Sequence, residues 1–230
     1  ENSISDCHNY GAVSAKSIAG DKKGGVGGVL GVFYADNTSG IAQSVLNLTS
    51  CSNNADVTLD GIGAGNCHVG GVAGGIVDGN ATGSITGCTN NGTVRNGTTE
   101  STATAKWIYT GGIIGQYGFA TGKISGCSNT GTVINGVHSN QTGGNIRIGG
   151  IAGNADCATF ENNTNSGTIK DVSLSYSIDM GGILGRFNCG SASTMTNCNN
   201  TGNIVSENNF SGTASNAFVS MGGIIGRTTK

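Results

Sequence analysis

The sequence of 230 residues contains no proline and few charged residues. The absence of proline excludes polyproline and collagen-like chains. Charged residues make up only 10% of the chain, far from the charge-rich composition of most disordered proteins. The longest basic run is Lys22-Lys23, so the electrostatic signature of a nucleic-acid-binding protein is missing. No apolar run reaches the roughly 20 residues that a membrane-spanning helix needs, and direct membrane insertion is not expected.

The sequence also lacks the common metal and catalytic motifs. There is no Cys-x-x-Cys pair, and the Cys7-His8 and Cys67-His68 pairs would point to opposite faces of a strand, which argues against zinc. The Asp-bearing glycine nonapeptide that binds calcium in some solenoids is missing, and so is His-Glu-x-x-His. We therefore expect no metal ion, no cofactor and no catalytic residue.

Glycine is abundant instead. It accounts for 43 of the 230 residues, well above the ordinary share of roughly 7%. Each interior glycine costs a helix about 0.8–1.0 kcal/mol relative to alanine, so long helices are not expected. Hydrophobic residues still make up 36% of the chain, which is enough for a core if they recur in register. This composition favours stacked strands that are joined by tight turns.

A Gly-Gly-aliphatic-small/aliphatic-Gly motif occurs six times along the chain. The pair lacks side chains to fill an interior, so it predicts a corner where the backbone packs closely. Residues before the pair alternate between apolar and other types, as in a half-buried strand. The first glycines of the six copies are Gly27, Gly70, Gly111, Gly149, Gly181 and Gly222.

A second motif, hydrophobic-x-x-Cys-x-Asn-x-Gly-x-Val/Ile, precedes each Gly-Gly copy. Asn and Gly tolerate positive φ, so Asn-x-Gly predicts a bend between two strands. If each repeat is one turn, equivalent Asn side chains lie about 4.8 Å apart and can hydrogen-bond in a buried ladder. The ladder positions are Asn9, Asn53, Asn90, Asn129, Asn165 and Asn200, and the Cys positions are Cys7, Cys51, Cys88, Cys127, Asn163 and Cys198.

Together the two motifs predict an all-β chain, a right-handed parallel β-solenoid (β-helix) of six repeats of about 38 residues. We expect residues 1–230 to form a single domain, as a fragment of a longer surface protein. One three-sided turn per repeat is favoured, and two shorter turns per repeat are the alternative. The repeats differ mainly in their links, and such loops carry variable binding in solenoids. The candidate binding loops are 36–44, 97–105, 135–144 and 207–216.

The eight cysteines can be interpreted in two ways. Five share one repeat position, and Cys67 falls on an inward strand site, which favours reduced thiols in the core. Cys157 and Cys189 are equivalent to each other and would be neighbours on adjacent turns. A disulfide between turns is therefore the alternative, although parallel side-chain directions make its geometry awkward.

A partly aromatic column follows the Gly-Gly motif. On an outer face such a column could stack against sugar rings, whereas in the core it would only pack, and core packing is favoured. Trp107, the only tryptophan, is open to the same two interpretations. The members of the column are Phe33, Ile76, Tyr117, Ala155, Phe187 and Thr228.

The paired motifs, with Gly-Gly-Ile-Ile-Gly at 111–115 and Cys-Ser-Asn-Thr-Gly-Thr-Val at 127–133, resemble the GLUG repeats of bacterial surface proteins. The resemblance covers essentially the whole chain. GLUG repeats occur in large secreted and cell-surface proteins, including adhesins that resemble filamentous haemagglutinin and regions that flank immunoglobulin A peptidases. The resemblance therefore implies a β-solenoid in an extracellular, cell-surface setting and names no ligand.

We expect a non-catalytic structural and adhesion module that displays binding loops. Its partners would be a host or neighbouring-cell surface protein or glycan, and flanking domains or further copies stacked end to end. A carbohydrate-binding or carbohydrate-active β-helix domain is the alternative. Catalysis would require converging carboxylates, and the acidic residues do not recur at equivalent sites of adjacent repeats. An ice-binding face would require Thr-x-Thr at equivalent positions of successive turns, and the candidate at 102–104 does not recur in this way.

Overall fold

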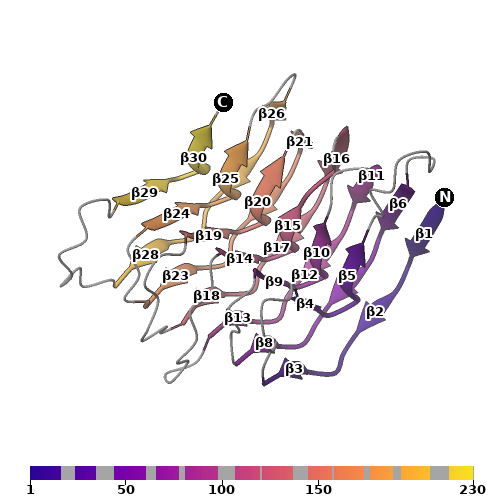
Figure 1. Cartoon of the computed structure of the whole chain (residues 1–230), viewed down its shortest axis with the longest axis horizontal. Helices are drawn as coiled ribbons and strands as arrows, with labels where there is room; N and C mark the ends of the chain where they lie inside the picture. Colours follow the sequence, from indigo (N-terminus) through magenta and orange to yellow (C-terminus); the bar gives the residue numbers. More distant parts are fainter. Residues whose placement is uncertain are drawn as a thin grey trace.

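A computed structural model describes residues 1–16, 24–34, 44–60, 66–77, 81–97, 107–119, 121–136, 145–156, 158–173, 177–188, 193–207 and 218–229. Within these ranges the chain forms five sheets, and each sheet takes one strand from each of the six repeats. Figure 1 shows the turns stacked side by side from the N-terminus to the C-terminus.

The sheets are numbered here in the order in which one turn of the chain visits them. Sheet 1 consists of β1 (Asn2–Ser5), β6 (Ser44–Thr49), β11 (Ala81–Thr86), β16 (Thr121–Ser125), β21 (Ala158–Glu161) and β26 (Thr194–Thr196). Sheet 2 consists of β2 (His8–Asn9), β7 (Ser52–Asn53), β12 (Thr89–Asn90), β17 (Ser128–Asn129), β22 (Thr164–Asn165) and β27 (Asn199–Asn200). Sheet 3 consists of β3 (Val13–Ala15), β8 (Val57–Leu59), β13 (Val94–Asn96), β18 (Val133–Asn135), β23 (Ile169–Asp171) and β28 (Ile204–Ser206).

The remaining two sheets follow the variable link. Sheet 4 consists of β4 (Gly24–Gly27), β9 (Cys67–Gly70), β14 (Trp107–Gly111), β19 (Asn145–Gly149), β24 (Ser177–Gly181) and β29 (Phe218–Gly222). Sheet 5 consists of β5 (Leu30–Tyr34), β10 (Ala73–Val77), β15 (Ile114–Tyr117), β20 (Ala152–Asp156), β25 (Leu184–Asn188) and β30 (Ile225–Thr229).

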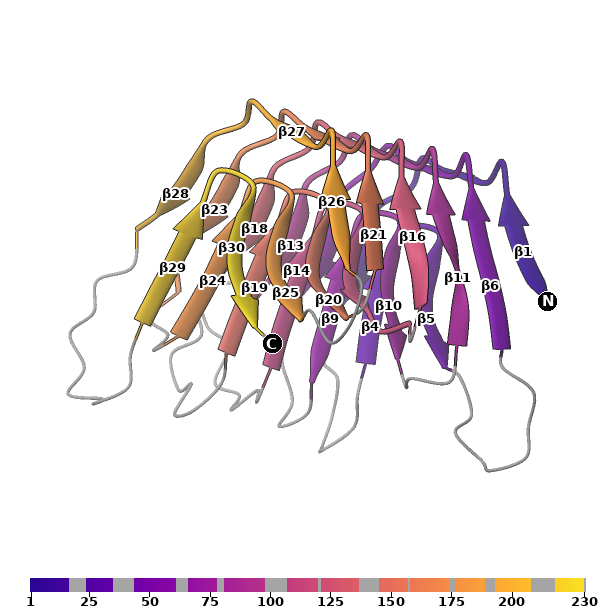
Figure 2. The ribbon, with the colours of Figure 1, turned by 90° about the horizontal axis from the view of Figure 1, so that it is seen from above.

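Every strand pairs in parallel with its counterpart in the next repeat, so equivalent residues lie beside each other. Ile85, for example, lies between Leu48 and Ile124 in sheet 1. Figure 2 shows that all five strands of a repeat are used before the chain moves along the axis. The prediction of a parallel β-solenoid with one turn per repeat is confirmed, and the alternative of two shorter turns is wrong.

The turn is not three-sided, however, because sheets 4 and 5 fold into its interior. The Gly-Gly corner between these sheets rests on the asparagine ladder of sheet 2. A β-carbon on Gly71 would lie 2.2 Å from the carbonyl oxygen of Gly112 and 2.3 Å from Cγ of Asn90. The corner reaches the ladder because no side chain holds it away. The glycine pair is thus a closely packed corner, as expected, but an internal one.

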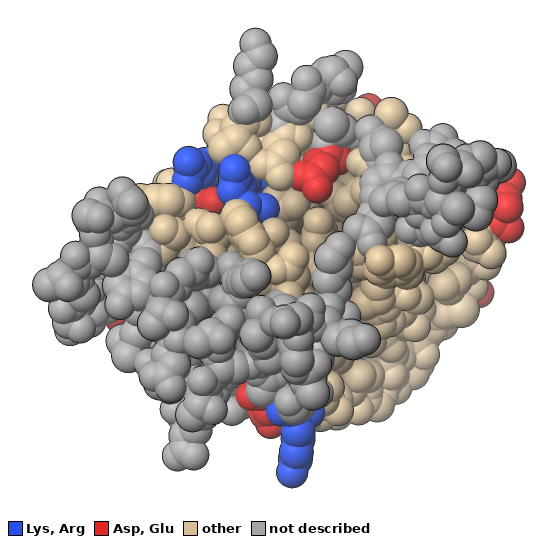
Figure 3. Space-filling view, viewed as in Figure 1, with Lys and Arg blue, Asp and Glu red and all other residues tan. Residues whose placement is uncertain are grey.

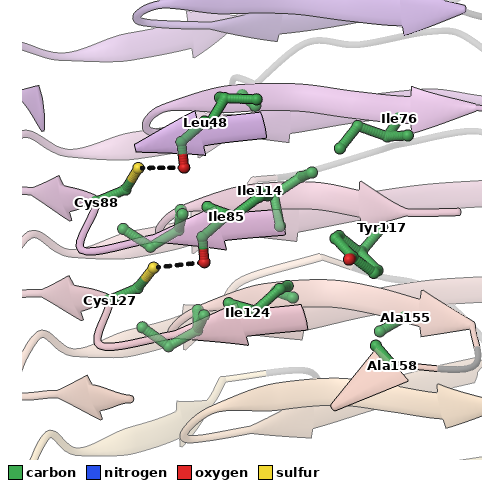
Figure 4. Packing of buried hydrophobic residues seen from close by; sticks show 14 of the residues in the cluster. Leu48, Ile76, Ile85, Cys88, Ile114, Tyr117, Ile124, Cys127, Ala155 and Ala158 are labelled. Atoms are coloured by element: carbon green, nitrogen blue, oxygen red, sulfur yellow. Dashed lines mark hydrogen bonds between the residues drawn. The ribbon is translucent and has the colours of Figure 1, made fainter. Parts of the chain in front are cut away.

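This inward fold divides the hydrophobic core in two. One cluster lies between sheets 1 and 5, with Leu48 and Ile85 from sheet 1 opposite Ile114 and Tyr117 from sheet 5. Figure 4 shows these side chains stacked from turn to turn. The other cluster lies between sheets 3 and 4 and includes Val133 and Ile146. Each turn adds several side chains to both clusters, and a small residue at one turn can lie beside a large one at the next, as Ala155 does beside Tyr117.

The aromatic column belongs to the first cluster. Tyr117 and Phe187 are buried, and Phe33 packs against the same cluster. The Tyr117 hydroxyl donates to the carbonyl of Gly83 at 3.1 Å, and the Phe160 ring meets Phe187 edge to face with centroids 5.6 Å apart. Core packing is therefore confirmed for this column, and it cannot stack on sugar rings.

The asparagine ladder is present in the described residues. The Nδ2 atom of Asn129 donates to Oδ1 of Asn165 at 2.7 Å, and Oδ1 of Asn129 accepts the equivalent bond from Nδ2 of Asn90 at 2.7 Å. The same amide also donates to the carbonyl of Gly131 at 2.8 Å, two residues along the chain. Bonds of 2.7 or 2.8 Å join Asn9 to Asn53, Asn53 to Asn90 and Asn165 to Asn200. The ladder thus fixes both the stacking of turns and the local bend.

The bend predicted at Asn-x-Gly is confirmed, although its residues do not adopt positive φ. Its glycines are needed for close approach, since a β-carbon on Gly131 would lie 1.9 Å from the carbonyl oxygen of Gly92. Positive φ occurs instead at the residue before each Cys position, in the bend between sheets 1 and 2. The residues there are Asp6, Ser50, Gly87, Gly126, Asn162 and Asn197, with φ between 51° and 63°.

We expect Ser50→Gly to stabilise the protein by about 1 kcal/mol. A left-handed conformation costs an L-residue roughly 1–2 kcal/mol, part of which is offset by the greater entropy of an unfolded glycine. Chemical denaturation would measure the change. Ser128→Gly, in β17 of the next sheet, is the control and should destabilise by about 0.5–1 kcal/mol. Equal effects of the two substitutions would contradict this account of the bend.

The cysteines of the repeat form a buried column along the axis. Cys51, Cys88 and Cys127 are buried free thiols, and Cys67 is a fourth in the second core cluster. In Figure 4 the Cys127 thiol points to the carbonyl of Ile85, at 3.6 Å. Where the column changes to asparagine, the Nδ2 atom of Asn163 donates to the equivalent carbonyl of Ile124 at 2.9 Å. Reduced core thiols are confirmed at these positions, whereas Cys157 and Cys189 lie outside the described residues.

We expect an alkylating reagent to label Cys7 in the folded protein and to label Cys51, Cys88 and Cys127 only after unfolding. Cys7 is exposed and the other three are buried. Burial also raises the pKa of Cys51, which removes the reactive thiolate. Mass spectrometry of peptides after a timed pulse would measure the labelling. Rapid native labelling of the three buried thiols would contradict the stacked core.

Candidate functional site

The outer faces of sheets 4 and 5 face each other across the inward fold. We call this interface the seam. A β-carbon on Gly75 of sheet 5 would lie 3.2 Å from Cβ of His68 of sheet 4, so the two sheets touch directly. Polar and aromatic side chains fill the seam along the axis. Its members are His68, Tyr109, Arg147 and Asp179 from sheet 4, and Asn154, Asp156, Arg186, Asn188, Arg227 and Thr229 from sheet 5.

Strand alternation places these side chains in the seam. In β19, Ile146 and Ile148 point into the second core cluster, so the intervening Arg147 points to the opposite face. In β24, Asp179 lies between Ile178 and Met180 in the same way. Arg147 and Asp179 are also register neighbours. Two opposite charges are thereby brought together from different repeats.

Arg147 is the centre of the seam. Its side chain is only 4% exposed, and its Nη1 donates to Oδ1 of Asn154. The guanidinium carbon lies 4.6 Å from the ring centroid of Trp107 and 4.9 Å from that of Tyr109. Burial lowers the pKa of Arg147 to about 10, so the group is still charged at pH 7. A buried cation that is held by two rings and an amide is a fixed positive charge.

Burial in the seam also shifts the pKa values of Asp179 and Tyr109. Desolvation raises the pKa of Asp179, which is 1% exposed, while Arg227, Arg147 and Arg186 act in the opposite direction. Burial raises the pKa of Tyr109 to about 12. The Tyr109 ring also stacks on His68, with centroids 5.2 Å apart. These contacts pack the interior of the seam.

At its outer side the seam carries a chain of hydrogen bonds. Asn188 donates to the carboxylate of Asp156, and the Thr229 hydroxyl donates to Oδ1 of Asn188 at 2.6 Å. Arg186 donates to the Thr229 hydroxyl through Nε and Nη2, each at 3.3 Å. Arg227 lies over the ring of Phe218, 4.3 Å from its centroid. The outer side therefore offers partly exposed guanidinium groups beside an aromatic ring, an arrangement suited to binding.

The structure describes only some of the candidate residues that were predicted from the sequence. Most of the loops 36–44, 97–105, 135–144 and 207–216, and all of 102–104, lie outside the described residues. Trp107 borders the seam and packs against Arg147. The seam itself was missed, although isolated charges between two core residues, as in 146–148 and 178–180, are a signal that could have found it.

Among the described residues, no three His, Cys, Asp or Glu side chains are grouped as a metal site would require. No helix in the described part of the chain has the length and apolar character to cross a membrane. Comparisons with protein-family models, curated proteins and solved structures find no match to this chain.

A buried polar contact between turns lies in sheet 3. Asp171 is fully buried, and its Oδ1 accepts from Nδ2 of Asn135 at 2.8 Å and from the backbone amide of Ser173 at 3.3 Å. Desolvation is the largest influence on this carboxyl, and it raises the pKa of Asp171. An ionised Asp171 therefore lowers stability at neutral pH, and protonation removes this cost.

We expect Asp171→Asn to raise the melting temperature at pH 7. The amide oxygen can still accept from Asn135, and no charge is buried. Because the folded pKa lies above the unfolded value of 3.8, the Asp171 contribution to stability falls as pH rises through that window. The difference between variant and parent should therefore be largest at pH 7 and shrink towards pH 4. Thermal unfolding at both pH values measures it, and a constant difference would contradict the account.

Proposed function

We propose that this chain is a non-catalytic structural and adhesion module on the surface of a bacterial cell. The observation that carries the proposal is the strand order of the five sheets, in which each turn pairs in parallel with the next. Such stacking produces a stiff rod with loops along its length, a form suited to holding a binding surface away from a cell. The resemblance of the two motifs to GLUG repeats supports the same setting.

Adhesion can be tested with beads that carry the chain. We expect such beads to attach to host or neighbouring cells, and soluble chain to compete. Labelling of intact cells with antibodies should place the parent protein outside the membrane. A glycan array would then separate protein from glycan partners. Beads that attach no better than albumin-coated beads to every cell type would contradict the adhesion function.

The two ends of the rod support a second kind of partner. The strands β1 to β5 and β26 to β30 lie at the edges of their sheets. At one end Met221 of β29 is 46% exposed, although its register neighbour Met180 is fully buried. We propose that flanking domains or another copy of the chain continue the stack there. Light scattering over a concentration series would detect self-association, and Ile4→Lys or Ile225→Lys should weaken it. A stable monomer at every concentration would contradict end-to-end stacking.

A carbohydrate-binding or carbohydrate-active domain is the second candidate, and the seam favours it. Asp156 and Asp179, which are distant in sequence, both interact with Arg147. We favour binding over catalysis because Asp179 is 1% exposed and a polymer cannot reach it. Release of reducing ends from a polysaccharide by the chain, and its loss in Asp156→Asn, would overturn the non-catalytic proposal.

A further inference from the structure

Two arginines occupy one register position of sheet 5, in the last two turns of the seam. Arg186 on β25 lies beside Arg227 on β30, and neighbouring strands are about 4.8 Å apart. Like charges at adjacent positions of a sheet repel each other. Arg147 is also near enough for Arg186 to influence its ionisation. Three positively charged guanidinium groups therefore lie close together. This arrangement is unfavourable unless negatively charged groups balance them.

The carboxylates nearby balance these cations only in part. Asp179 is buried inside the seam, and Asp156 accepts hydrogen bonds from Asn188 and Asn154. Three guanidinium groups therefore face two carboxylates. The ion pairs within 4.0 Å among the described residues, His8–Asp6, Lys123–Glu161 and Lys170–Glu207, include no arginine.

The two outer arginines are directed at uncharged partners. Arg186 donates to the hydroxyl of Thr229, and Arg227 lies over the ring of Phe218. Both arginines are partly exposed, so a ligand can reach them. Figure 3 shows a group of described basic side chains in the part of the view where Figure 1 draws β25 and β30.

We propose that Arg186 and Arg227 bind an anionic group of an acidic polysaccharide, a carboxylate or a sulfate. A guanidinium group forms paired hydrogen bonds with either anion, and two neighbouring groups can share one ligand. The positive charge of the buried Arg147 in the same seam adds attraction. This ligand class deepens the proposed adhesion function and rests on it.

The test is a titration of the folded chain with polygalacturonate, dextran sulfate, neutral dextran and inorganic sulfate. We expect binding to one or both acidic polymers, weakened by salt, and none to neutral dextran. Arg186→Gln and Arg227→Gln should each weaken binding about tenfold. Arg95→Gln, on β13 of sheet 3, makes the same charge change away from the seam and should leave binding unchanged.

Asp179→Asn should change the affinity for acidic polymers in the opposite direction. Removal of the buried carboxylate leaves the arginines with less internal compensation, so acidic polymers should bind several-fold more tightly. Loss of folding cannot produce tighter binding, and circular dichroism would confirm that each variant is folded. Unchanged or weaker binding by a folded Asp179→Asn variant would count against the site.

The outcomes separate the possible ligands. Binding of polygalacturonate alone identifies a carboxylate, and binding of dextran sulfate alone identifies a sulfate. Inorganic sulfate that binds as tightly as the polymers, no binding of either polymer, or an equal loss in Arg95→Gln would overturn the proposal. Adhesion to cells without binding of acidic polymers would leave the adhesion function in place and remove only this site. Binding of the polymers without adhesion to any cell would support this site and remove the adhesion function.

Discussion

Gly112→Ala is expected to destabilise the protein by about 3 kcal/mol or more, enough to unfold a marginal chain. A β-carbon at this position would lie 2.1 Å from the carbonyl oxygen of Gly150 and 2.4 Å from Cγ of Asn129. One contact is with the backbone of the next turn and the other is with the buried ladder. Neither neighbour can rotate away, so the turns would have to separate. Denaturant unfolding, followed by circular dichroism, measures the loss.

The chain provides a matched control for this substitution. Gly223 holds the same motif position in the last repeat, and a β-carbon there would meet no heavy atom within 4 Å. Gly223→Ala should therefore change stability by no more than about 0.5 kcal/mol. A similar loss in both variants would show that the backbone conformation, and not the contact between turns, requires glycine.

Asn129→Ala is expected to cost about 3 kcal/mol. The substitution removes two hydrogen bonds that Asn129 donates, to Gly131 and Asn165, and one that it accepts from Asn90. All these groups are buried, so the partners left behind have no water to replace the lost bonds. A single unsatisfied buried group costs about 1–3 kcal/mol. The midpoint of urea unfolding would measure the change.

Asn199→Ala is the control for the ladder. Asn199 precedes the ladder residue Asn200 in β27, but its side chain is exposed. We expect a change within about 0.5 kcal/mol. Equal unfolding midpoints for the Asn129 and Asn199 variants would contradict a ladder that stabilises the stack.

The sequence by itself determined the stacking of the turns. Recurrence of the Gly-Gly and Cys-x-Asn motifs identifies the repeat, and parallel strands then place equivalent residues beside each other. The ladder of Asn129 and its equivalents and the thiol column of Cys88 and Cys127 follow directly from that periodicity. Contacts along the solenoid axis join equivalent positions of neighbouring repeats, so the repeat sequence specifies them.

Only the tertiary structure decided how one turn closes. The inward fold of sheets 4 and 5 depends on the Gly71 corner fitting against Asn90, a contact between segments that no periodicity relates. The same fold brings Arg147 of sheet 4 to Asn154 and Arg186 of sheet 5 and so creates the seam. Alternation shows that Arg147 leaves the core, but it does not show what the outer face meets. Contacts across a turn join unlike positions, and their partners are set by the path of the backbone in three dimensions.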